Sequence, residues 1–361
     1  MGTDIHRTLL TDGHLDRLHT VAQVDTTTTI STITPLTHSA PTLTGTDTAA
    51  TLTDTALTLT GTAPSLTDSD PALTVRLAHA EVLFTHWGAP PLTEDVLHRM
   101  PRLRAVVHAA GSVKHHVTEA VWKRGITVSS AAEANAVPVA EFTLAAILFA
   151  GKRVVDVARA YGRTRTPPAL LPYYRGHGNY RRTIGVVGAS RVGRRVLGLL
   201  RPFDLHVLLH DPYVDPAEAR ALGAEPAGLD ELAARSDVVT IHAPQLPETR
   251  HMFDARRLAL LKDGATLVNT ARGSLVDTDA LTPHLITGRL GAVLDVTEPD
   301  TPPPGSPLYT LPNVLLTPHI AGSLGNELGR MTDWAIDEVA RYAHGLPFAH
   351  GVGPEELTRS A

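Results

Sequence analysis

Residues 182–195 read RTIGVVGASRVGRR, and this stretch indicates how the second half of the chain folds. A β-branched run ends at Gly188 and a helical pattern opens at Arg191, which is the strand–turn–helix context of a dinucleotide fingerprint. Gly188 would make the tight turn, and Gly193 would let the helix pack closely on the strand. The helix N-terminus offers free N–H groups to a pyrophosphate. Ser190 stands where this pattern usually has glycine, so its Cβ would lie close to the phosphate.

Five further strands are predicted after this one. They read HVLLHD (206–211), DVVTIHAP (237–244), TLVNT (266–270), AVLDV (292–296) and NVLLTPH (313–319). Most are near-continuous apolar runs, typical of parallel strands covered on both faces, and helical segments separate them. This alternation predicts a doubly wound Rossmann domain. Asp211 ends the second strand of the series, where a carboxylate can bind the ribose hydroxyls of NAD and repel the 2′-phosphate of NADP.

An earlier series of strands, at 81–85, 104–108 and 126–130, alternates with helical stretches and predicts a second parallel sheet. A long helix is predicted at 139–161, with Pro138 just before its start. A final helix, from about 324 to 344, is expected to return the chain to the first domain.

The predicted fold class is therefore α/β, with two doubly wound parallel-sheet domains and a cleft between them. The flavodoxin-like substrate domain takes residues 1–138 plus 323–361, and the Rossmann NAD-binding domain takes residues 139–322.

A Thr-rich stretch occupies residues 26 to about 71 and is broken by Pro and Gly. Its alternating Leu and Thr residues are compatible with strands. However, the stretch lacks the aromatic and large apolar residues that offset chain entropy. We therefore expect a mobile insertion in the first domain.

The bulk composition excludes several classes of function. The 361 residues are 43% hydrophobic with a formal net charge of −5, so no nucleic-acid or membrane partner is predicted. The chain has no Cys, which rules out disulfides, thiolate metal sites and Cys nucleophiles, and no metal is predicted. The longest apolar run, at 142–150, is too short to span a bilayer. Since no secretory signal is visible, a cytoplasmic location is expected.

Several long segments, in their order along the chain, resemble the D-isomer-specific 2-hydroxyacid dehydrogenases. These include phosphoglycerate, glyoxylate/hydroxypyruvate and D-lactate dehydrogenases. The segments are ANAVPVAEFTLA (134–145), GVVGASRVG (185–193), HAPQLPETRHMF (242–253), LVNTARGSLVD (267–277), AVLDVTEPD (292–300) and LLTPHIAGS (315–323). The resemblance runs from about residue 80 to 348. It implies a homodimer that uses NAD to transfer a hydride to or from C2 of a small 2-hydroxy or 2-oxo acid of the D series.

The resemblance also implies a catalytic Arg, an acid and a His. Arg272 would hold the substrate carboxylate and polarise the carbonyl with its planar guanidinium. His319 would deliver or accept the proton at the carbonyl oxygen, because its unperturbed pKa suits that task. The family has a Glu five residues after the Asp of the LDV segment, and Asp300, one methylene shorter, stands there. Glu298 is the alternative, and we favour Asp300 as the partner of His319.

Further residues are assigned to the cofactor by the same resemblance. Asp295 would hold the nicotinamide carboxamide. The others are Arg191 and Val192 at the pyrophosphate, Thr270 and Ala271 beside the nicotinamide ring, and His242 and Pro244 in the loop beside the cofactor. In the first domain, HAAGSVKHHV (108–117) aligns with a loop whose backbone amides bind the substrate carboxylate. Its candidate residues are Gly111, Ser112 and Val113.

Three other interpretations share this fold. Formate dehydrogenases typically carry Gln at the acid position, so Asp300 argues against that activity. An NAD-sensing regulatory protein with little turnover is an alternative, because such proteins can retain the catalytic trio. Ser190 and Asp300 also leave a decayed enzyme open.

Overall fold

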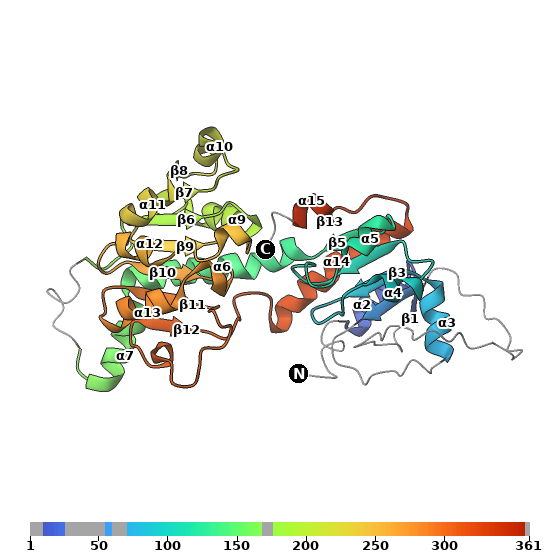
Figure 1. Cartoon of the computed structure of the whole chain (residues 1–361), viewed down its shortest axis with the longest axis horizontal. Coiled ribbons are helices and arrows are strands. Elements are labelled where there is room, and N and C mark those ends of the chain that lie inside the picture. The colour runs from blue at the N-terminus through green and yellow to red at the C-terminus, as the bar shows by residue number, and fades with distance from the viewer. Residues whose placement is uncertain (1–9, 26–54, 60–70, 168–175, 358–361) are drawn as a thin grey trace, which may run out of the picture. The chain divides into compact units, whose positions relative to one another are not determined.

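The computed structural model describes residues 10–25, 55–59, 71–167 and 176–357. The chain divides into two compact units between Asn135 and Ala136 and again between Ser323 and Leu324. Of the described residues, the first unit combines those up to 135 with 324–357, and the second unit takes 136–323. Each unit is built on its own largely parallel sheet (Figure 1). The predicted α/β class with parallel sheets is confirmed.

The second unit holds a seven-stranded sheet in the order β12-β11-β10-β9-β6-β7-β8, and all its strand pairs are parallel. The strands are β6 (Thr183–Val187), β7 (His206–His210), β8 (Glu225–Pro226), β9 (Val238–Ile241), β10 (Thr266–Asn269), β11 (Gly291–Leu294) and β12 (Val314–Leu316). The first strand, β6, lies in the interior of the sheet. The strands β7 and β8 are added on one side of it, and β9 to β12 are added on the other side. This is the strand order of a Rossmann fold.

Helices cover both faces of this sheet. They are α9 (Arg191–Leu200), α10 (Pro216–Ala221), α11 (Leu229–Arg235), α12 (Ala255–Leu260) and α13 (Thr278–Ile286), with α6 and α7 described below. Leu267 packs in one core with Leu232 and Leu258, whereas Val268 packs in another with Val196. Successive side chains of a strand point to opposite faces, so β10 is buried on both sides.

The helix predicted at 139–161 is two helices in the structure. α6 (Ala132–Lys152) begins earlier, so Pro138 lies inside it rather than before its start. Arg153 has a left-handed φ of 52° and separates α6 from α7 (Val154–Thr164). The apolar pattern runs on across this break, which is why the sequence suggested one helix. Among the described residues, α6 is the one helix long and apolar enough to cross a membrane, and half of its apolar window is buried.

The first unit holds a six-stranded sheet in the order β1-β2-β3-β4-β5-β13. The strands are β1 (Gln23–Asp25), β2 (Thr55–Leu59), β3 (Ala80–Thr85), β4 (Ala105–His108), β5 (Thr127–Ser130) and β13 (Gly351–Val352). The first five are parallel, and β13 joins β5 in the antiparallel direction. A flavodoxin-like sheet runs 2-1-3-4-5, whereas β1 lies outside β2 here.

Part of the Thr-rich stretch belongs to this sheet. Thr55–Leu59 forms β2, which pairs with β1 on one side and with β3 on the other. The expectation of a mobile insertion is therefore wrong for this segment. Its backbone hydrogen-bonds to both neighbouring strands. The expectation of mobility for residues 26–54 and 60–70 falls outside the described residues.

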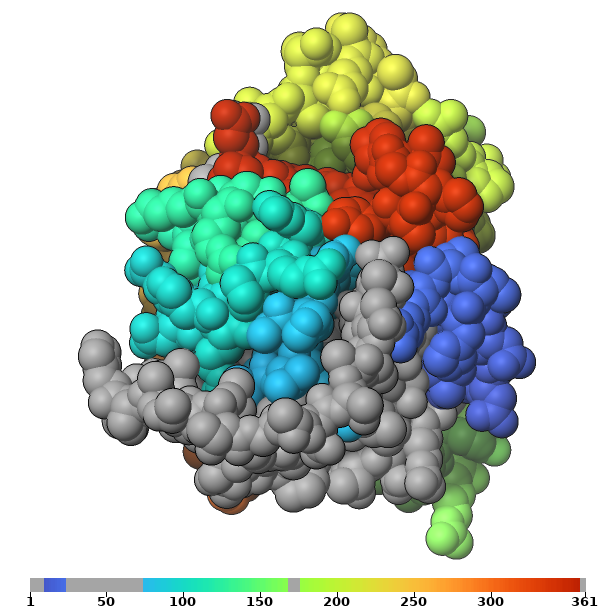
Figure 2. All heavy atoms as spheres, turned by 90° about the vertical axis from the view of Figure 1, so that its right-hand side faces the viewer, coloured from blue at the N-terminus to red at the C-terminus, as the bar shows by residue number. Residues whose placement is uncertain are grey.

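Helices also cover both faces of the first sheet. They are α2 (Asp12–His19), α3 (Pro71–His79), α4 (Glu94–His98), α5 (Glu119–Lys123), α14 (Leu328–Ala343) and α15 (Pro354–Leu357). Arg17 of α2 donates a hydrogen bond to Asp337 of α14 at 2.8 Å. Figure 2 shows the blue α2 beside the red C-terminal part of the chain. Leu97 and Val106 share one core of this unit, and Val107 and Val339 share the other.

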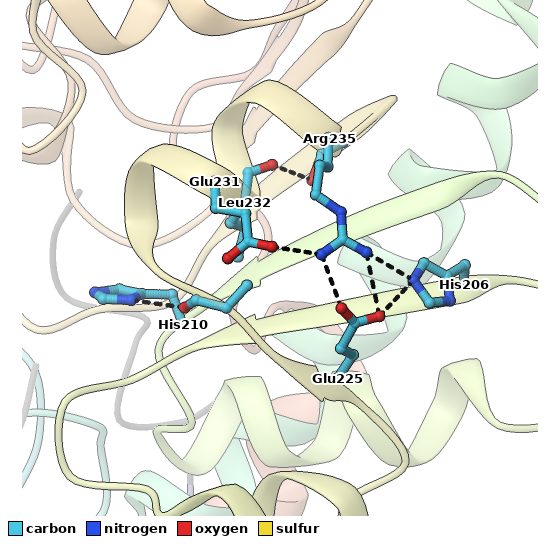
Figure 3. Close-up of polar contacts among 8 residues, drawn as sticks. His206, His210, Glu225, Glu231, Leu232 and Arg235 are labelled. Atoms are coloured by element: carbon cyan, nitrogen blue, oxygen red, sulfur yellow. Dashed lines mark hydrogen bonds and ion pairs between the residues drawn. The ribbon is translucent and has the colours of Figure 1, made fainter.

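A polar cluster attaches the edge strand β8 to its neighbours (Figure 3). Arg235 of α11 donates to Glu225 at 2.8 Å and to Glu231 at 2.6 Å, and His206 lies 2.9 Å from Glu225. His206 is the first residue of β7, so this cluster marks the amino end of the strand. Its side chains are more than a third exposed, and such pairs contribute little stability. We assign the cluster a structural role.

Candidate active site

One row of register-paired residues crosses the second sheet just before its strands end. From β12 to β7 the row is Leu316, Leu294, Asn269, Ile241, Val187 and His210. The residues that follow the row are Thr317, Asp295, Thr270, His242, Gly188 and Asp211. All but Thr317 are site residues predicted from the sequence. They therefore lie at one carboxyl edge, where open α/β sheets bind their ligands.

Two glycines shape the turn after β6. Gly188 has a φ of 96°, and an added Cβ there would lie 2.8 Å from the backbone nitrogen of Ala243. An added Cβ at Gly193 would lie 1.9 Å from the carbonyl oxygen of Gly188. A side chain at either position would force backbone segments apart. The turn thus forms a cradle whose walls are backbone, which suits a close approach by a pyrophosphate.

Ser190 is the N-cap of α9, and its hydroxyl accepts from the N–H of Gly193 at 3.3 Å. Ser190 therefore already satisfies one of the free N–H groups at the helix start, where Arg191 and Val192 form the first turn. The Asp211 carboxylate accepts from the N–H of Ala189 at 2.7 Å. This bond fixes Asp211 beside the turn, and a carboxylate has further acceptor positions for ribose hydroxyls.

Asn269 holds the loop that carries Arg272. The Asn269 side chain donates to the carbonyl oxygen of Arg272 at 2.8 Å and accepts from the N–H of Ala271 at 3.1 Å. Burial lowers the pKa of the Arg272 guanidinium, and the negative charge of Asp300 opposes this shift. Because a partly dehydrated guanidinium pairs strongly with carboxylates, Arg272 is suited to bind an anionic ligand.

Gly273 allows the Arg272 loop to approach the loop that follows β11. An added Cβ at Gly273 would lie 1.9 Å from the carbonyl oxygen of Thr297 and 2.8 Å from the nitrogen of Glu298. Only glycine permits this contact between two backbones. The contact places Asp300, two residues beyond Glu298, within electrostatic reach of Arg272.

The loop that carries His319 is attached to Asp295. The buried Asp295 carboxylate accepts from the Thr317 hydroxyl at 2.6 Å and from the N–H groups of Ile320 at 2.8 Å and Ala321 at 2.9 Å. The His319 N–H donates to the Asp295 carbonyl at 2.9 Å. His319 is exposed and has a left-handed φ of 56°, which is uncommon for a residue with a side chain. The geometry thus makes Asp295 a positioning residue for His319, and its contact with the nicotinamide stays a prediction.

The two carboxylates considered as partners of His319 differ in their surroundings. Glu298 accepts from Arg250 at 2.5 Å and from His251 at 2.7 Å, and these hydrogen bonds lower the pKa of Glu298. Asp300 is exposed and has Arg272 as its charged neighbour. Within the described part of the chain, no hydrogen bond or ion pair joins His319 to either carboxylate. Because Glu298 is already paired, Asp300 stays our choice.

Four predicted cofactor residues remain, and they lie at the same edge. The Thr270 hydroxyl is 3.0 Å from that of Thr143 in α6, and the adjacent Ala271 is buried. His242 is fully buried with an unpaired Nδ1, and burial lowers its pKa to about 3. The Pro244 carbonyl accepts from a threonine hydroxyl at 2.7 Å. Buried, neutral groups of this kind shape the wall of a ligand site.

The candidate substrate loop lies in the first unit, directly after β4. An added Cβ at Gly111 would lie 3.3 Å from the side-chain nitrogen of Asn135. The Ser112 hydroxyl accepts from the N–H of Lys114 at 3.4 Å. The Val113 side chain is buried in the core of the unit, so Val113 can meet a ligand only through its backbone.

Asn269 and Gly273 were not predicted from the sequence, nor were His86 and His108, which with His116 are buried beside the substrate loop. Asn269 and Gly273 stand within the NTARG segment, yet their roles depend on loops that are distant in sequence. Across the described ranges, no three His, Cys, Asp or Glu side chains are grouped so that they could hold a metal ion.

The Rossmann strand order, the glycine cradle and Asp211 define a dinucleotide-binding protein. Arg272 and His319 at the same sheet edge add a carboxylate-binding cation and a group that can exchange a proton.

Comparison with known proteins extends this definition. A family model described as D-isomer specific 2-hydroxyacid dehydrogenase, NAD binding domain, matches residues 144–321. A D-3-phosphoglycerate dehydrogenase from Methanocaldococcus jannaschii is 33% identical over 69% of this chain and 47% of its own length. A glyoxylate reductase from Korarchaeum cryptofilum is 34% identical over 71% of this chain and 77% of its own. The structure of D-lactate dehydrogenase from Aquifex aeolicus, complexed with NAD and lactic acid, has a TM-score of 0.62 at 29% identity, over 80% of this chain and 89% of that one.

The chain belongs to the D-isomer specific 2-hydroxyacid dehydrogenase family, as its motifs suggested. It spans about half the length of the phosphoglycerate dehydrogenases that it matches. The NAD-binding family model and the relative complexed with NAD support NAD as the cofactor. The glycine cradle and the fixed Asp211 carboxylate fit that group.

Proposed function

We propose that this chain is an NAD-dependent D-2-hydroxyacid dehydrogenase that interconverts small 2-hydroxy and 2-oxo acids. The observation that carries the proposal is the placement of Arg272 and His319 beyond the carboxyl ends of strands in one register. Asn269, Leu294 and Leu316 are paired across β10, β11 and β12, and the loops that follow carry Arg272, Asp295 and His319. Reduction of a 2-oxo acid needs an anchor for the carboxylate and a proton donor for the carbonyl oxygen. The family relatives named above act on acids of this class.

Each residue of the site has a role in this reaction. When bound, NAD accepts a hydride from C2 of the hydroxy acid, and its reduced form supplies one to C2 of the oxo acid. Arg272 binds the substrate carboxylate and polarises the carbonyl. His319 donates a proton to the carbonyl oxygen and takes it back in the reverse direction. Asp300 is assigned as the acidic partner that orients the His319 imidazole.

Further residues are proposed to bind the substrate and the cofactor. Backbone N–H groups of Gly111, Ser112 and Val113 form a second anchor for the substrate carboxylate. In the second unit, Asp211 binds the ribose, and its charge repels a 2′-phosphate, so NAD is preferred to NADP. The remaining cofactor contacts are assigned to Gly188, Ser190, Arg191, Val192, Gly193, His242, Pro244, Thr270, Ala271 and Asp295.

We also propose a cytoplasmic homodimer. The cytoplasmic location is supported by the metabolic activities named for the relatives, and the homodimer by resemblance to the family. Size-exclusion chromatography with light scattering tests the dimer, which a monomer mass would contradict.

The primary test is the loss of NADH absorbance with glyoxylate, pyruvate, hydroxypyruvate, phenylpyruvate and 3-phosphohydroxypyruvate. Wild-type turnover should fall by about 100-fold or more in His319→Ala, since general acid–base catalysis contributes about 10²–10⁴-fold. His344→Ala, at an exposed position after α14, is the matched control and should keep wild-type turnover. NADH binding without turnover of any acid would contradict the proposed enzyme and favour a sensor.

A further inference from the structure

In the second unit, backbone hydrogen bonds join the loop after β9 to the loop after β10. The His251 N–H donates to the Ser274 carbonyl at 2.7 Å. Phe253 donates to the Leu275 carbonyl and accepts from the Asp277 N–H, each at 3.1 Å. Because these bonds use only main-chain atoms, they fix the second half of the loop after β10 whatever the side chains are.

A side-chain cluster joins the loop after β11 to these two loops. Glu298, in the loop after β11, accepts from Arg250 at 2.5 Å and from His251 Nε2 at 2.7 Å. These hydrogen bonds lower the pKa of Glu298, so its carboxylate is ionised and can only accept. His251 Nε2 therefore carries a proton in this bond. Asp277 Oδ2 lies 3.8 Å from His251 Nδ1, which gives the imidazole a second acidic neighbour.

The three loops are thus joined in pairs. His251 bonds the loop after β10 through its backbone and the loop after β11 through its side chain. The loops after β10 and β11 also meet directly, because Gly273 packs against the backbone of Thr297 and Glu298. None of the three loops can shift without breaking contacts to the other two, which is how supporting contacts hold a site in one geometry.

The pair of His251 and Glu298 is better suited to fixing local geometry than to adding stability. His251 has a left-handed φ of 48°, and a residue other than glycine stays in that conformation only where its surroundings impose it. The side chains of His251 and Glu298 are 33% and 34% exposed. Ion pairs with such exposure add little to the free energy of unfolding.

We propose that His251 and Glu298 are positioning residues that hold the loop of Arg272 and the loop of Asp300 at a fixed separation. This inference rests on the proposed function and adds a device that sets the geometry of its site. Arg272 lies two residues before Ser274, and Asp300 lies two residues after Glu298. Without the pair, Arg272 should hold the substrate carboxylate in a less productive position.

A double-mutant cycle with His251→Asn and Glu298→Gln tests the pair. Asparagine tolerates a left-handed backbone, so His251→Asn keeps the backbone conformation and removes the ring that reaches Glu298. Glu298→Gln keeps the shape of the side chain and removes its charge. His251→Gln is the rescue variant, because glutamine is long enough to bring an amide N–H near the position of Nε2.

The matched control is a second His–Glu pair of the same unit, which lies at the amino end of β7 (Figure 3). His206 Nε2 lies 2.9 Å from Glu225 Oε2, and the two side chains are 48% and 42% exposed. The control cycle uses His206→Asn and Glu225→Gln. Because this pair is at the opposite edge of the sheet from the site, its loss should leave the KM for the 2-oxo acid within about twofold of wild type.

The KM for the best 2-oxo acid should rise about fivefold in His251→Asn and in Glu298→Gln, with kcat kept within about threefold. The double variant should also show about a fivefold rise, since both substitutions remove the same contact. His251→Gln should stay within about twofold of wild type. Unchanged KM in either single variant, or a rise of about 25-fold in the double variant, would overturn the inference.

If the wild type turns over none of the acids, the proposed function fails, and hydrogen exchange of the full chain decides on the positioning role. The amides of residues 273–277 should then exchange about fivefold faster or more in Glu298→Gln. They should keep the wild-type rate in Glu225→Gln, and the amides of β10 should stay protected in both variants. Faster exchange confined to residues 296–301 would show that Glu298 holds only its own loop, which would overturn the inference.

Discussion

The Asp295 carboxylate accepts a hydrogen bond from the Thr317 hydroxyl at 2.6 Å, between residues 22 positions apart. The bond joins the end of β11 to the end of β12, and two backbone N–H groups from the same loop donate to the same carboxylate. Asp295 thus organises a loop around His319, which the structure holds in a left-handed conformation. The orientation of a proposed proton donor therefore depends on a buried carboxylate on the neighbouring strand.

Asp295→Asn should lower both stability and turnover. The amide replaces one acceptor oxygen by a donor that faces other N–H groups, and a buried unsatisfied donor costs about 1–3 kcal/mol. Displacement of His319 should lower kcat by about 100-fold, the cost of a misplacement near 1 Å. Thr317→Val removes only one hydrogen bond and should cost about 1 kcal/mol. Denaturant unfolding and NADH oxidation measure the two effects, and wild-type kcat in Asp295→Asn would refute the positioning role.

Two glycines of α9 should respond to alanine in opposite directions. Gly198 is exposed with no atom within 4 Å of an added Cβ, so Gly198→Ala should stabilise the protein by about 0.8–1 kcal/mol through helix propensity. At Gly193 the Cβ would meet the Gly188 carbonyl at 1.9 Å. Gly193→Ala should therefore destabilise by about 1–3 kcal/mol and weaken NADH binding in a fluorescence titration. Equal effects of the two substitutions would contradict the close approach at Gly193.

Gly273→Ala tests the contact between the Arg272 loop and the loop after β11. The added Cβ would lie 1.9 Å from the Thr297 carbonyl, so one backbone must move, at a cost of about 1–3 kcal/mol. The KM for the 2-oxo acid should rise because Arg272 is displaced. Gly305→Ala is the control, since no atom lies within 4 Å of its Cβ. A Gly273→Ala enzyme with unchanged KM would show that the site tolerates the movement.

Asp300→Asn should lower turnover more than Glu298→Gln. Glu298 is paired with Arg250 and His251, so its loss should act mainly on the local loop. Asp300→Asn removes the charge assigned to the imidazole, and kcat should fall by about tenfold or more. The reverse ranking would identify Glu298 as the partner of His319.

The stability of the protein should fall as the pH drops below about 6.5. Burial lowers the pKa of His242 to about 3, so between these values the unfolded chain binds a proton that the folded chain does not. The free energy of unfolding then rises with pH by up to about 1.4 kcal/mol per pH unit for such a group. His242→Gln should flatten this slope in urea unfolding between pH 4 and 7. His344→Gln, at an exposed position, should keep it, and an unchanged slope in His242→Gln would show that the ring is protonated in the folded state.

The fold of the second unit was predicted well from local sequence patterns. GVVGASRVG combines a buried strand, a turn that needs glycine and a helix start within nine residues, so nearly all the information is local. The Val/Ile/Leu runs likewise predicted six of the seven strands of this sheet. The helix at 139–161 was predicted less well. The break between its two halves is a single left-handed residue, Arg153, and one such residue does not interrupt the apolar pattern.

The first unit shows the opposite case. Thr55–Leu59 lies in a stretch with little apolar content, and it becomes a strand because β1 and β3 supply hydrogen bonds on both sides. The buried histidines His86 and His108 were equally difficult to recognise among the 19 histidines of the sequence. Their burial depends on helices and loops that no local pattern describes.

By itself, the sequence determined the α/β class, the dinucleotide turn and the identity of the groups proposed for chemistry, because each of these is encoded over a few neighbouring residues. Only the tertiary structure decided which groups meet: Asp295 with the His319 loop, Gly273 with Thr297, and Glu298 with Arg250 and His251. The physical reason is that these contacts join loops from different strands. Their distances depend on sheet register and backbone packing, which arise only when the whole unit has folded.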